Sequence, residues 1–210
     1  MKSNLLKYER ELYKNKITLI AGVDEAGRGP LVGPVVAAAV ILPKNYKLEG
    51  LNDSKQLSEK KREEFYHILK NEALSIGVGI VSAKIIDEIN ILEASRQAMY
   101  IALNNLDITP EYILSDAMSL NDIDIPSRPI IHGDALSLSI AAASVIAKVT
   151  RDHIMYDMDK AHPEYNLRKH KGYPTKEHLA LIEKYGIFEE YRKTFKPIKK
   201  ILEVKEYEKI

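Results

Sequence analysis

Short apolar runs, separated by segments rich in glycine and proline, predict the strands of a buried sheet. The first two runs, residues 17–23 and 35–42, consist mainly of β-branched and small apolar side chains, with glycines and prolines between them. Three further runs have the same character, at 74–81, 112–116 and 129–134. The pattern therefore predicts five strands, and acidic residues follow or close three of them.

Helical spacing of apolar residues fills most of the intervals between these runs. Ser58, Ser82 and Thr175 stand where side-chain oxygens commonly cap the start of a helix. Small side chains between Ser137 and Lys160 predict a long, buried helix that packs closely against a sheet or another helix. The expected helices cover residues 59–72, 85–89, 92–106, 137–160 and 175–185.

The order of the expected elements indicates the fold class. It runs strand, strand, helix, strand, helices, strand, strand and then helices, which predicts an α/β or α+β arrangement with a mixed sheet flanked by helices. A chain of 210 residues with 45% hydrophobic content can bury one substantial core but is too short for two full-sized domains. We therefore expect one main domain.

Composition narrows the class of protein further. The chain has no cysteine, which excludes disulfides, thiolate metal sites and a thiol nucleophile and is compatible with a reducing cytoplasm. The first 16 residues lack the apolar segment of a signal peptide. The longest nearly apolar stretch, residues 31–42, is shorter than the ~20 residues needed to cross a bilayer. We expect a soluble, cytoplasmic protein that does not bind a membrane.

Positive charge is concentrated near the C-terminus, although the formal net charge is only +1. Between Lys160 and Lys200 there are 11 lysines and arginines against 5 aspartates and glutamates, with His162, His170 and His178 interleaved. Such a stretch could follow a phosphate backbone, whereas a solvated helical face is the commoner explanation of a charge run by itself. Charge alone leaves both interpretations open.

The most informative segment is Val-Asp-Glu-Ala-Gly-Arg-Gly-Pro at residues 23–30, directly after the first apolar run. It places Asp24 and Glu25 at the end of a strand, while Asp116 and Asp134 end two other expected strands. Strand ends on one edge of a sheet are neighbours in space. Two hard cations ~3.5 to 4 Å apart, held by such acids, could activate a water and stabilise the leaving oxygen of a phosphodiester displacement.

Each of these groups also has a more ordinary explanation. An acidic pair in a turn is most often solvated surface, and an aspartate at a strand end is often a turn former. Asp152 lies four residues after Lys148, which favours an ion pair and leaves at most an outer-shell role at a metal. His132 and His170 have no second histidine at ligand spacing, so a structural or substrate-facing role is expected for both. The glycines of residues 27–33 lack the Gly-Lys-Ser/Thr ending of a nucleotide phosphate-binding loop, which excludes that site.

Five motifs, in one order, closely resemble those of bacterial ribonuclease HII over roughly residues 19–186. They are Asp24 to Pro30, Leu51 to Lys55, Asp116, Gly133 to Ala135 followed by Ala141 to Asp152, and Lys169 to Tyr173. The resemblance implies a ribonuclease H-like fold with a five-stranded mixed sheet flanked by helices. It also implies an N-terminal helical segment over 1–16, a catalytic domain over 17–160 and a helical C-terminal extension over 161–210 that contacts substrate.

The resemblance implies an endoribonuclease that cuts the RNA strand of RNA:DNA hybrids and cuts at single ribonucleotides embedded in duplex DNA. Products would carry 5′-phosphate and 3′-hydroxyl ends, two Mg²⁺ or Mn²⁺ ions would be the cofactors, and the chain would act as a monomer. Ribonuclease HIII would have a large N-terminal extension and a different residue in place of Arg28, whereas 23 residues precede Asp24 here. A non-catalytic hybrid-binding module on the same fold is the alternative from another class, and loss of an acid would have favoured it.

Carried over motif by motif, the resemblance assigns the site residues. The catalytic and metal-binding acids would be Asp24, Glu25, Asp116 and Asp134. The substrate-binding residues would be Gly27, Arg28 and Gly29, which read the junction between a ribonucleotide and the next deoxyribonucleotide, Lys55 on a phosphate, and Tyr173 stacked beside the junction. Because the 2′-hydroxyl distinguishes RNA from DNA at a given site, backbone groups of small residues are suited to reach it.

Three positions depart from the family pattern. Leu136 stands where lysine is usual, and Ala117 and Pro174 stand where glycine is common. These departures put one phosphate contact and the local shape of two loops in doubt, while every acid is in place.

Overall fold

One mixed sheet organises the protein, and the computed structural model describes residues 5–51, 54 and 57–207. The strands are β1 (Ile20–Ala26), β2 (Val35–Ile41), β3 (Ser75–Val81), β4 (Tyr112–Asp116) and β5 (Ser127–Ile130). Their order in the sheet is β3-β2-β1-β4-β5. Strand β1 pairs antiparallel with β2 and parallel with β4. The expected five-stranded mixed sheet flanked by helices is confirmed.

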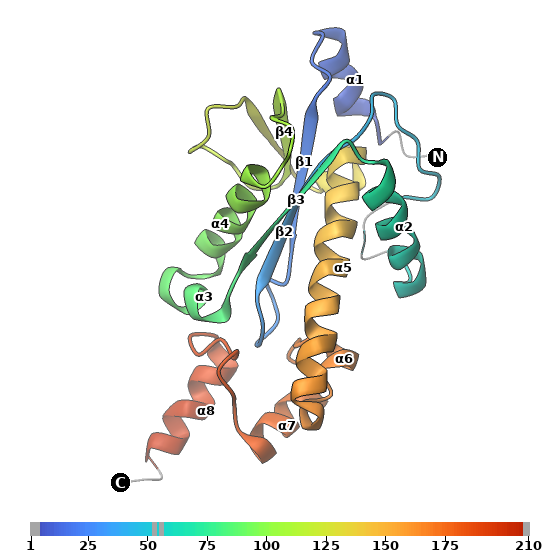
Figure 1. Cartoon of the computed structure of the whole chain (residues 1–210). Coiled ribbons are helices and arrows are strands. Elements are labelled where there is room, and N and C mark those ends of the chain that lie inside the picture. The colour runs from blue at the N-terminus through green and yellow to red at the C-terminus, as the bar shows by residue number, and fades with distance from the viewer. Residues whose placement is uncertain (1–4, 52–53, 55–56, 208–210) are drawn as a thin grey trace.

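Helices cover both faces of this sheet (Figure 1). Helices α3 (Ala83–Ile89) and α4 (Ile91–Asn104) pack on one face, and α2 (Glu59–Glu72) and α5 (Leu138–Ala161) pack on the other. At one end of α5 lie α6 (Leu167–His170), α7 (Lys176–Tyr185) and α8 (Lys196–Tyr207), whereas α1 (Lys7–Lys14) lies near its other end. Two short 3-10 helices, η2 (Gly133–Ala135) and η3 (Pro163–Tyr165), flank α5. In the described part of the chain, no helix combines the length and the apolar character that a bilayer crossing requires.

The three expected helix caps are confirmed. The side-chain oxygens of Ser58, Ser82 and Thr175 each accept a hydrogen bond from the backbone N–H three residues further on, at 3.3, 3.4 and 3.1 Å. Cap chemistry is local, since donor and acceptor lie within one helical turn. The sequence therefore predicts these helix starts well.

The prediction of a strand over 129–134 is wrong for residues 131–134. Strand β5 ends at Ile130, His132 has left-handed backbone with φ 57°, and Asp134 lies in η2 just before α5. The backbone N–H of Gly133 donates to Oδ1 of Asp116 at 2.8 Å, and this contact with a neighbouring strand accompanies the turn. Ile131, which reads as part of a buried run, has an exposed fraction of 73%.

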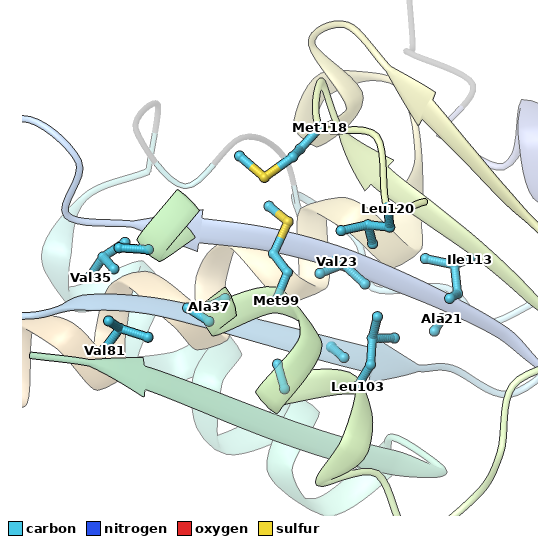
Figure 2. Close-up of a cluster of buried hydrophobic side chains, with 14 of the residues drawn as sticks. Ala21, Val23, Val35, Ala37, Val81, Met99, Leu103, Ile113, Met118 and Leu120 are labelled. Carbon is cyan, nitrogen blue, oxygen red and sulfur yellow. The ribbon is translucent and has the colours of Figure 1, made fainter. Parts of the chain in front are cut away.

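Separate apolar cores lie on the two faces of the sheet. On one face, Met99 and Leu103 of α4 pack over side chains of β1, β2 and β3, and Met118 and Leu120 close the cluster beside β4 (Figure 2). On the other face, the small side chains of α5 pack against β2, as expected for its alanine-rich sequence.

Helix α5 also lies very close to strand β1. A Cβ atom added to Gly22 would lie 2.0 Å from the carbonyl carbon of Ser139, a distance that no side chain can occupy. Glycine at this position therefore allows the backbone of the helix to rest directly on the strand. The contact fixes the position of α5 relative to the strand that carries Asp24.

Helix α1 caps the start of α5. The carboxylate of Glu9, with an exposed fraction of 1%, accepts a hydrogen bond from the Ser137 hydroxyl at 2.6 Å and another from the backbone N–H of Ser139 at 3.0 Å. The first turn of a helix has free N–H groups and the positive end of the helix dipole, so an anion is stabilised there. The N-terminal helix thus supports the long buried helix, while the division of the chain into domains stays a prediction.

We expect Glu9→Ala to lower the free energy of unfolding by about 2 kcal/mol, because two buried, charge-assisted hydrogen bonds are lost. Urea denaturation followed by circular dichroism measures the change. The matched control is Glu11→Ala on the same helix, where the side chain is 59% exposed. The control should change stability by less than about 0.5 kcal/mol. Equal stability of the two variants would show that the Glu9 cap contributes nothing.

Candidate active site

The parallel pairing of β1 with β4 brings two of the expected acids side by side. Val23 pairs with Ser115 in the parallel register, so the next residues, Asp24 within β1 and Asp116 at the end of β4, lie side by side. The expected end of the first strand at Val23 is wrong, because β1 stays paired with β2 as far as Ala26. Asp24 is 4% exposed and Asp116 is partly buried. Strand register alone therefore places two carboxylates at one edge of the sheet, as the sequence predicts.

Asp134 reaches the same edge by a different route. The bond from the Gly133 N–H to Asp116 holds η2 against the end of β4, and Ala117 donates its backbone N–H to the carbonyl of Ile130 at 2.9 Å. One carboxylate oxygen each from Asp24, Asp116 and Asp134 then lie within 4.8 Å of one another. The three aspartates form a cluster that could hold a metal ion.

The backbone at Ala117 explains one departure from the family pattern. Its φ is 51°, in the left-handed region that glycine adopts without steric cost. The hydrogen bond from the Ala117 N–H to β5 accompanies this conformation. The substitution is therefore accommodated with local strain, and the position of Asp116 beside it is kept.

The electrostatics of the cluster fit a hard cation. Burial, together with the nearby carboxylates of Glu25 and Asp116, raises the pKa of Asp24 well above its ordinary value. Hydrogen bonds from Ser144 and from the Glu25 N–H, the latter at 2.7 Å, oppose this rise. Buried carboxylates repel one another and lack the water that would screen them. A divalent ion such as Mg²⁺ or Mn²⁺ stabilises such a group of oxygen ligands. These residues therefore fit the metal ions that the sequence predicts.

Glu25 occupies a different position from the three aspartates. Successive side chains of a strand point to opposite faces, so Glu25 and Asp24 diverge. Among the described residues, the acids whose oxygens converge are the three aspartates. Oε1 of Glu25 lies 3.4 Å from Nη1 of Arg28, which links the acids to the glycine-flanked arginine. The assignment of Glu25 as a metal ligand stays a prediction.

Two buried arginines hold the loop between β1 and β2, and no motif in the sequence predicts a role for either. Arg192, 0% exposed, donates to three carbonyl oxygens of this loop, at 2.6 Å for Gly27, 3.0 Å for Arg28 and 3.0 Å for Gly33. Arg151, 1% exposed, donates to three further carbonyl oxygens, at 3.2 Å for Val32, 3.0 Å for Pro34 and 3.1 Å for Lys171. We call this pair the loop arginines.

The loop arginines remain charged although they are buried. Burial lowers the pKa of Arg151 to about 10 and the pKa of Arg192 to about 9, both still above neutral pH. Their acceptors are neutral peptide carbonyls. Five of the six bonds fix the path of residues 27–34, and the sixth, to Lys171, ties the loop to the segment that carries Tyr173. A Cβ atom on Gly27 would lie 2.1 Å from Nε of Arg151, so glycine there also makes room for the guanidinium.

Tyr173 lies against the same loop. A Cβ atom on Gly29 would lie 3.3 Å from Cε1 of the Tyr173 ring, and the ring is partly open to solvent because the residue is 43% exposed. The backbone N–H of Leu31 donates to the carbonyl of Gly172 at 2.8 Å and ties the two segments together. The structure thus brings Tyr173 to the loop of Gly27, Arg28 and Gly29, far away in sequence.

Lys55, the expected phosphate contact, lies outside the described residues. Its near neighbour Ser54 is described and buried, with Oγ 2.8 Å from Oγ of Ser144 on α5. Ser144 in turn hydrogen-bonds Asp24. The chain at Ser54 therefore lies close to the acidic cluster.

Three further polar residues from the sequence analysis have partners in the structure. Asp152 is bonded to Lys148 at 2.7 Å, so the predicted ion pair four residues apart is confirmed. Lys169 is paired with Glu177 at 2.6 Å. His170 is 7% exposed and hydrogen-bonded to backbone, as expected for a structural histidine.

A neutral substitution at Asp24 should separate metal binding from folding. In the metal-free protein, we expect Asp24→Asn to raise the free energy of unfolding at pH 8 by about 1 kcal/mol, because ionised Asp24 is buried and repelled. The cost of a raised folded-state pKa is complete above that pKa and shrinks to zero as the pH falls to the ordinary, unfolded pKa. The gain should therefore disappear below about pH 4, where folded and unfolded carboxyls are both protonated. Urea denaturation in chelator measures this gain.

Divalent metal should reverse the order of stability. Added Mn²⁺ should stabilise the wild type but not Asp24→Asn, because binding to the folded state alone shifts the unfolding equilibrium. Asp124→Asn, a change at an exposed aspartate, is the matched control and should respond to metal as the wild type does. Equal stabilisation of Asp24→Asn by Mn²⁺ would contradict the assignment of Asp24 to the metal site.

Comparisons with known proteins agree with this geometry. The family model for ribonuclease HII matches residues 21–198. The chain is 56% identical over 199 residues to ribonuclease HII of Bacillus cytotoxicus, an alignment that covers 95% of this chain and 76% of the relative. The crystal structure of ribonuclease H2 from Pyrococcus horikoshii OT3 matches with a TM-score of 0.73 and 30% identity, covering 88% of this chain and 97% of that one.

A ribonuclease HIII shares the fold but is more distant in sequence. The structure of Bst-RNase HIII in complex with Mn²⁺ matches with a TM-score of 0.64 and 17% identity, covering 92% of this chain and 72% of that one. The family match therefore favours ribonuclease HII over ribonuclease HIII. With this match across most of its length, and with a ribonuclease H-like sheet carrying its clustered aspartates, the chain belongs to the ribonuclease HII family and is an endoribonuclease of the ribonuclease H class.

Proposed function

We propose that this endoribonuclease cuts the RNA strand of RNA:DNA hybrids and also cuts at single ribonucleotides embedded in duplex DNA, leaving 5′-phosphate and 3′-hydroxyl ends. The observation that carries the proposal is the cluster of Asp24, Asp116 and Asp134, with oxygens within 4.8 Å of one another, in which Asp24 lies on the strand that leads into the Gly27 to Gly29 loop. One acid of the cluster and a loop of small residues are thereby adjacent along the chain. This arrangement supports cleavage next to a recognised sugar.

We propose that two divalent ions, Mg²⁺ or Mn²⁺, are held by the three aspartates and Glu25. When bound, such ions would lower the pKa of the attacking water and stabilise charge on the leaving oxygen. The protein fixes its own ligands in advance: Asp24 accepts from the Glu25 N–H at 2.7 Å and Asp116 accepts from the Gly133 N–H at 2.8 Å. Carboxylates held by backbone donors need little reorganisation when a metal arrives.

Recognition of the ribonucleotide is assigned to the loop of Gly27, Arg28 and Gly29 together with Tyr173. Because Arg192 holds the carbonyls of Gly27 and Arg28, the loop keeps one path without substrate. The Arg28 side chain is 49% exposed and Tyr173 is 43% exposed, so both are available to a duplex. An aromatic ring beside small residues suits packing on a sugar whose 2′-hydroxyl is read by backbone groups.

The remaining features of the proposal concern affinity and context. Lys55 and the basic extension over 161–210 would contact phosphates, supplying affinity that does not depend on sequence and weakens with salt. We propose a monomer that works in the cytoplasm on hybrids and on ribonucleotide-containing DNA. The ion pair between Lys169 and Glu177 makes Lys169 a weaker candidate for a phosphate contact than its sequence position indicates.

Cleavage of a duplex with one embedded ribonucleotide tests the proposal against a non-catalytic binder. We expect Asp116→Asn to lose at least about 10³-fold in kcat, because one charged metal ligand is removed while its shape is kept. The same variant should still bind the duplex in a gel-shift assay. Chelator should abolish wild-type cleavage, and Asp124→Asn should cut normally. A wild type that binds but does not cut with either Mg²⁺ or Mn²⁺ would favour the binding module.

The ring of Tyr173 should set the preference for a ribonucleotide junction. We expect Tyr173→Phe to keep most activity on the single-ribonucleotide duplex, since it retains the ring. Tyr173→Ala should lose about 10- to 100-fold there and much less on a long RNA:DNA hybrid, where many scissile positions are available. The ratio of kcat/KM on the two substrates measures the preference. A wild-type ratio in folded Tyr173→Ala would assign recognition to the glycine loop alone.

A further inference from the structure

Two buried histidines lie behind Tyr173 and take no part in the chemistry described so far. His178, in the first turn of α7, is 0% exposed, and His170, at the end of α6, is 7% exposed. Their rings are stacked, with centroids 4.2 Å apart and an angle of 22° between the planes. The chain between them carries Gly172 and Tyr173, so the pair is placed to control the conformation of that turn.

The hydrogen-bond partners of His178 determine its tautomer. Nδ1 lies 2.9 Å from the carbonyl oxygen of Tyr173, which can only accept, so Nδ1 carries hydrogen and donates. Burial lowers the pKa of His178 to about 4, so the ring is neutral at physiological pH and its Nε2 accepts. The hydroxyl of Tyr191, 2.8 Å from Nε2, supplies the hydrogen. One directed chain therefore runs from Tyr191 through His178 to the backbone of Tyr173.

His170 binds the same turn on its other side, where it accepts a hydrogen bond from the backbone instead of donating one. Its Nε2 lies 2.9 Å from the carbonyl oxygen of Tyr165 and must donate, so its Nδ1 accepts the backbone N–H of Gly172 at 3.2 Å. Burial also lowers the pKa of His170. The two neutral rings thus bind an N–H and a C=O from adjacent residues, Gly172 and Tyr173.

The turn fixed by the histidines is pressed onto the glycine loop. Gly172 has φ 84°, and a Cβ atom there would lie 2.8 Å from Cγ1 of Val32. Its carbonyl accepts the Leu31 N–H at 2.8 Å. Pro174 restricts the backbone on the far side of Tyr173, where the Thr175 N–H donates to the Tyr173 carbonyl at 2.8 Å. The Tyr173 ring beside Gly29 therefore depends on how its own carbonyl is held.

We infer that His178 is a positioning residue that sets the Tyr173 ring against Gly29, and that the Tyr191 hydroxyl supports it by donating to the Nε2 left as acceptor. His178 does not touch substrate, and it acts through the carbonyl of Tyr173. This inference rests on the proposed role of Tyr173 at the ribonucleotide junction. His178 thereby influences the choice between substrates more than the rate of the cleavage step.

Four variants of the full chain test the inference through the ratio of kcat/KM on the single-ribonucleotide duplex to that on a long hybrid. His178→Leu removes the donor but fills similar volume, and His178→Asn keeps an N–H near the position of Nδ1. Tyr173→Ala removes the ring, and the fourth variant combines Tyr173→Ala with His178→Leu. Urea denaturation checks that each variant is folded.

We expect His178→Leu to lower the ratio by about 10-fold or more, since small displacements of a substrate-positioning group have effects of this size. His178→Asn should restore most of the ratio. In the Tyr173→Ala background, His178→Leu should change the ratio by less than about 2-fold, because residues that act through one contact are not additive. General damage to the fold would instead lower kcat/KM on both substrates, and its effect would add to that of Tyr173→Ala.

The outcomes separate this inference from the proposed function. If folded His178→Leu keeps the wild-type ratio while Tyr173→Ala loses it, the inference is overturned and the role of Tyr173 stands. If Tyr173→Ala itself keeps the wild-type ratio, the proposed recognition by Tyr173 fails.

The tautomer can be measured without any substitution. Nitrogen-15 NMR of the wild-type imidazoles at neutral pH should show a neutral His178 with hydrogen on Nδ1, and Tyr191→Phe should weaken this preference. A protonated ring, or hydrogen on Nε2 in the wild type, would overturn the inference even if the His178 variants failed to fold.

Discussion

The contact between strand β1 and helix α5 sets the geometry on which the site depends. A Cβ atom at Gly22 would lie only 2.0 Å from the carbonyl carbon of Ser139, so the backbones of strand and helix are in direct contact. Asp24 lies two residues beyond Gly22 on the strand, and Asp134 lies in the turn that leads into the helix. A side chain at Gly22 would separate the two elements and spread the aspartates at the same time.

The long helix α5 also connects the acids to the recognition loop. In its second turn, Ser144 hydrogen-bonds Asp24, and two turns later, near the middle of the helix, Arg151 holds the carbonyls of Val32 and Pro34. The two functions proposed for the site, metal binding and recognition of the sugar, are therefore built on one rigid element. Because α5 is buried along most of its length, the distance between the metal-binding acids and the recognition loop is set by packing in the core.

Local chemistry made part of this structure predictable from the sequence. Helix caps at Ser58, Ser82 and Thr175 depend on atoms within one turn, and the meeting of Asp24 with Asp116 follows from strand ends at one edge. The turn before Asp134 was missed because it involves a hydrogen bond between Asp116 and Gly133, which no local pattern reveals. Lys55 lies outside the described residues, so its role stays a prediction.

The loop arginines escaped prediction for a similar reason, since their burial depends on carbonyls from a distant loop. In sequence, each resembles an ordinary surface arginine.

Those buried charges also bear on how a polyanion approaches the molecule. Peptide carbonyls stabilise the guanidinium groups of Arg151 and Arg192 without cancelling their charge, and charges in the protein interior are screened by salt less than surface charges are. The formal net charge of +1 thus says little about the Gly27 to Gly33 loop, behind which two positive charges are held in fixed positions. A phosphate that approached the loop would meet charges that need no reorganisation, whereas an exposed lysine must first be ordered.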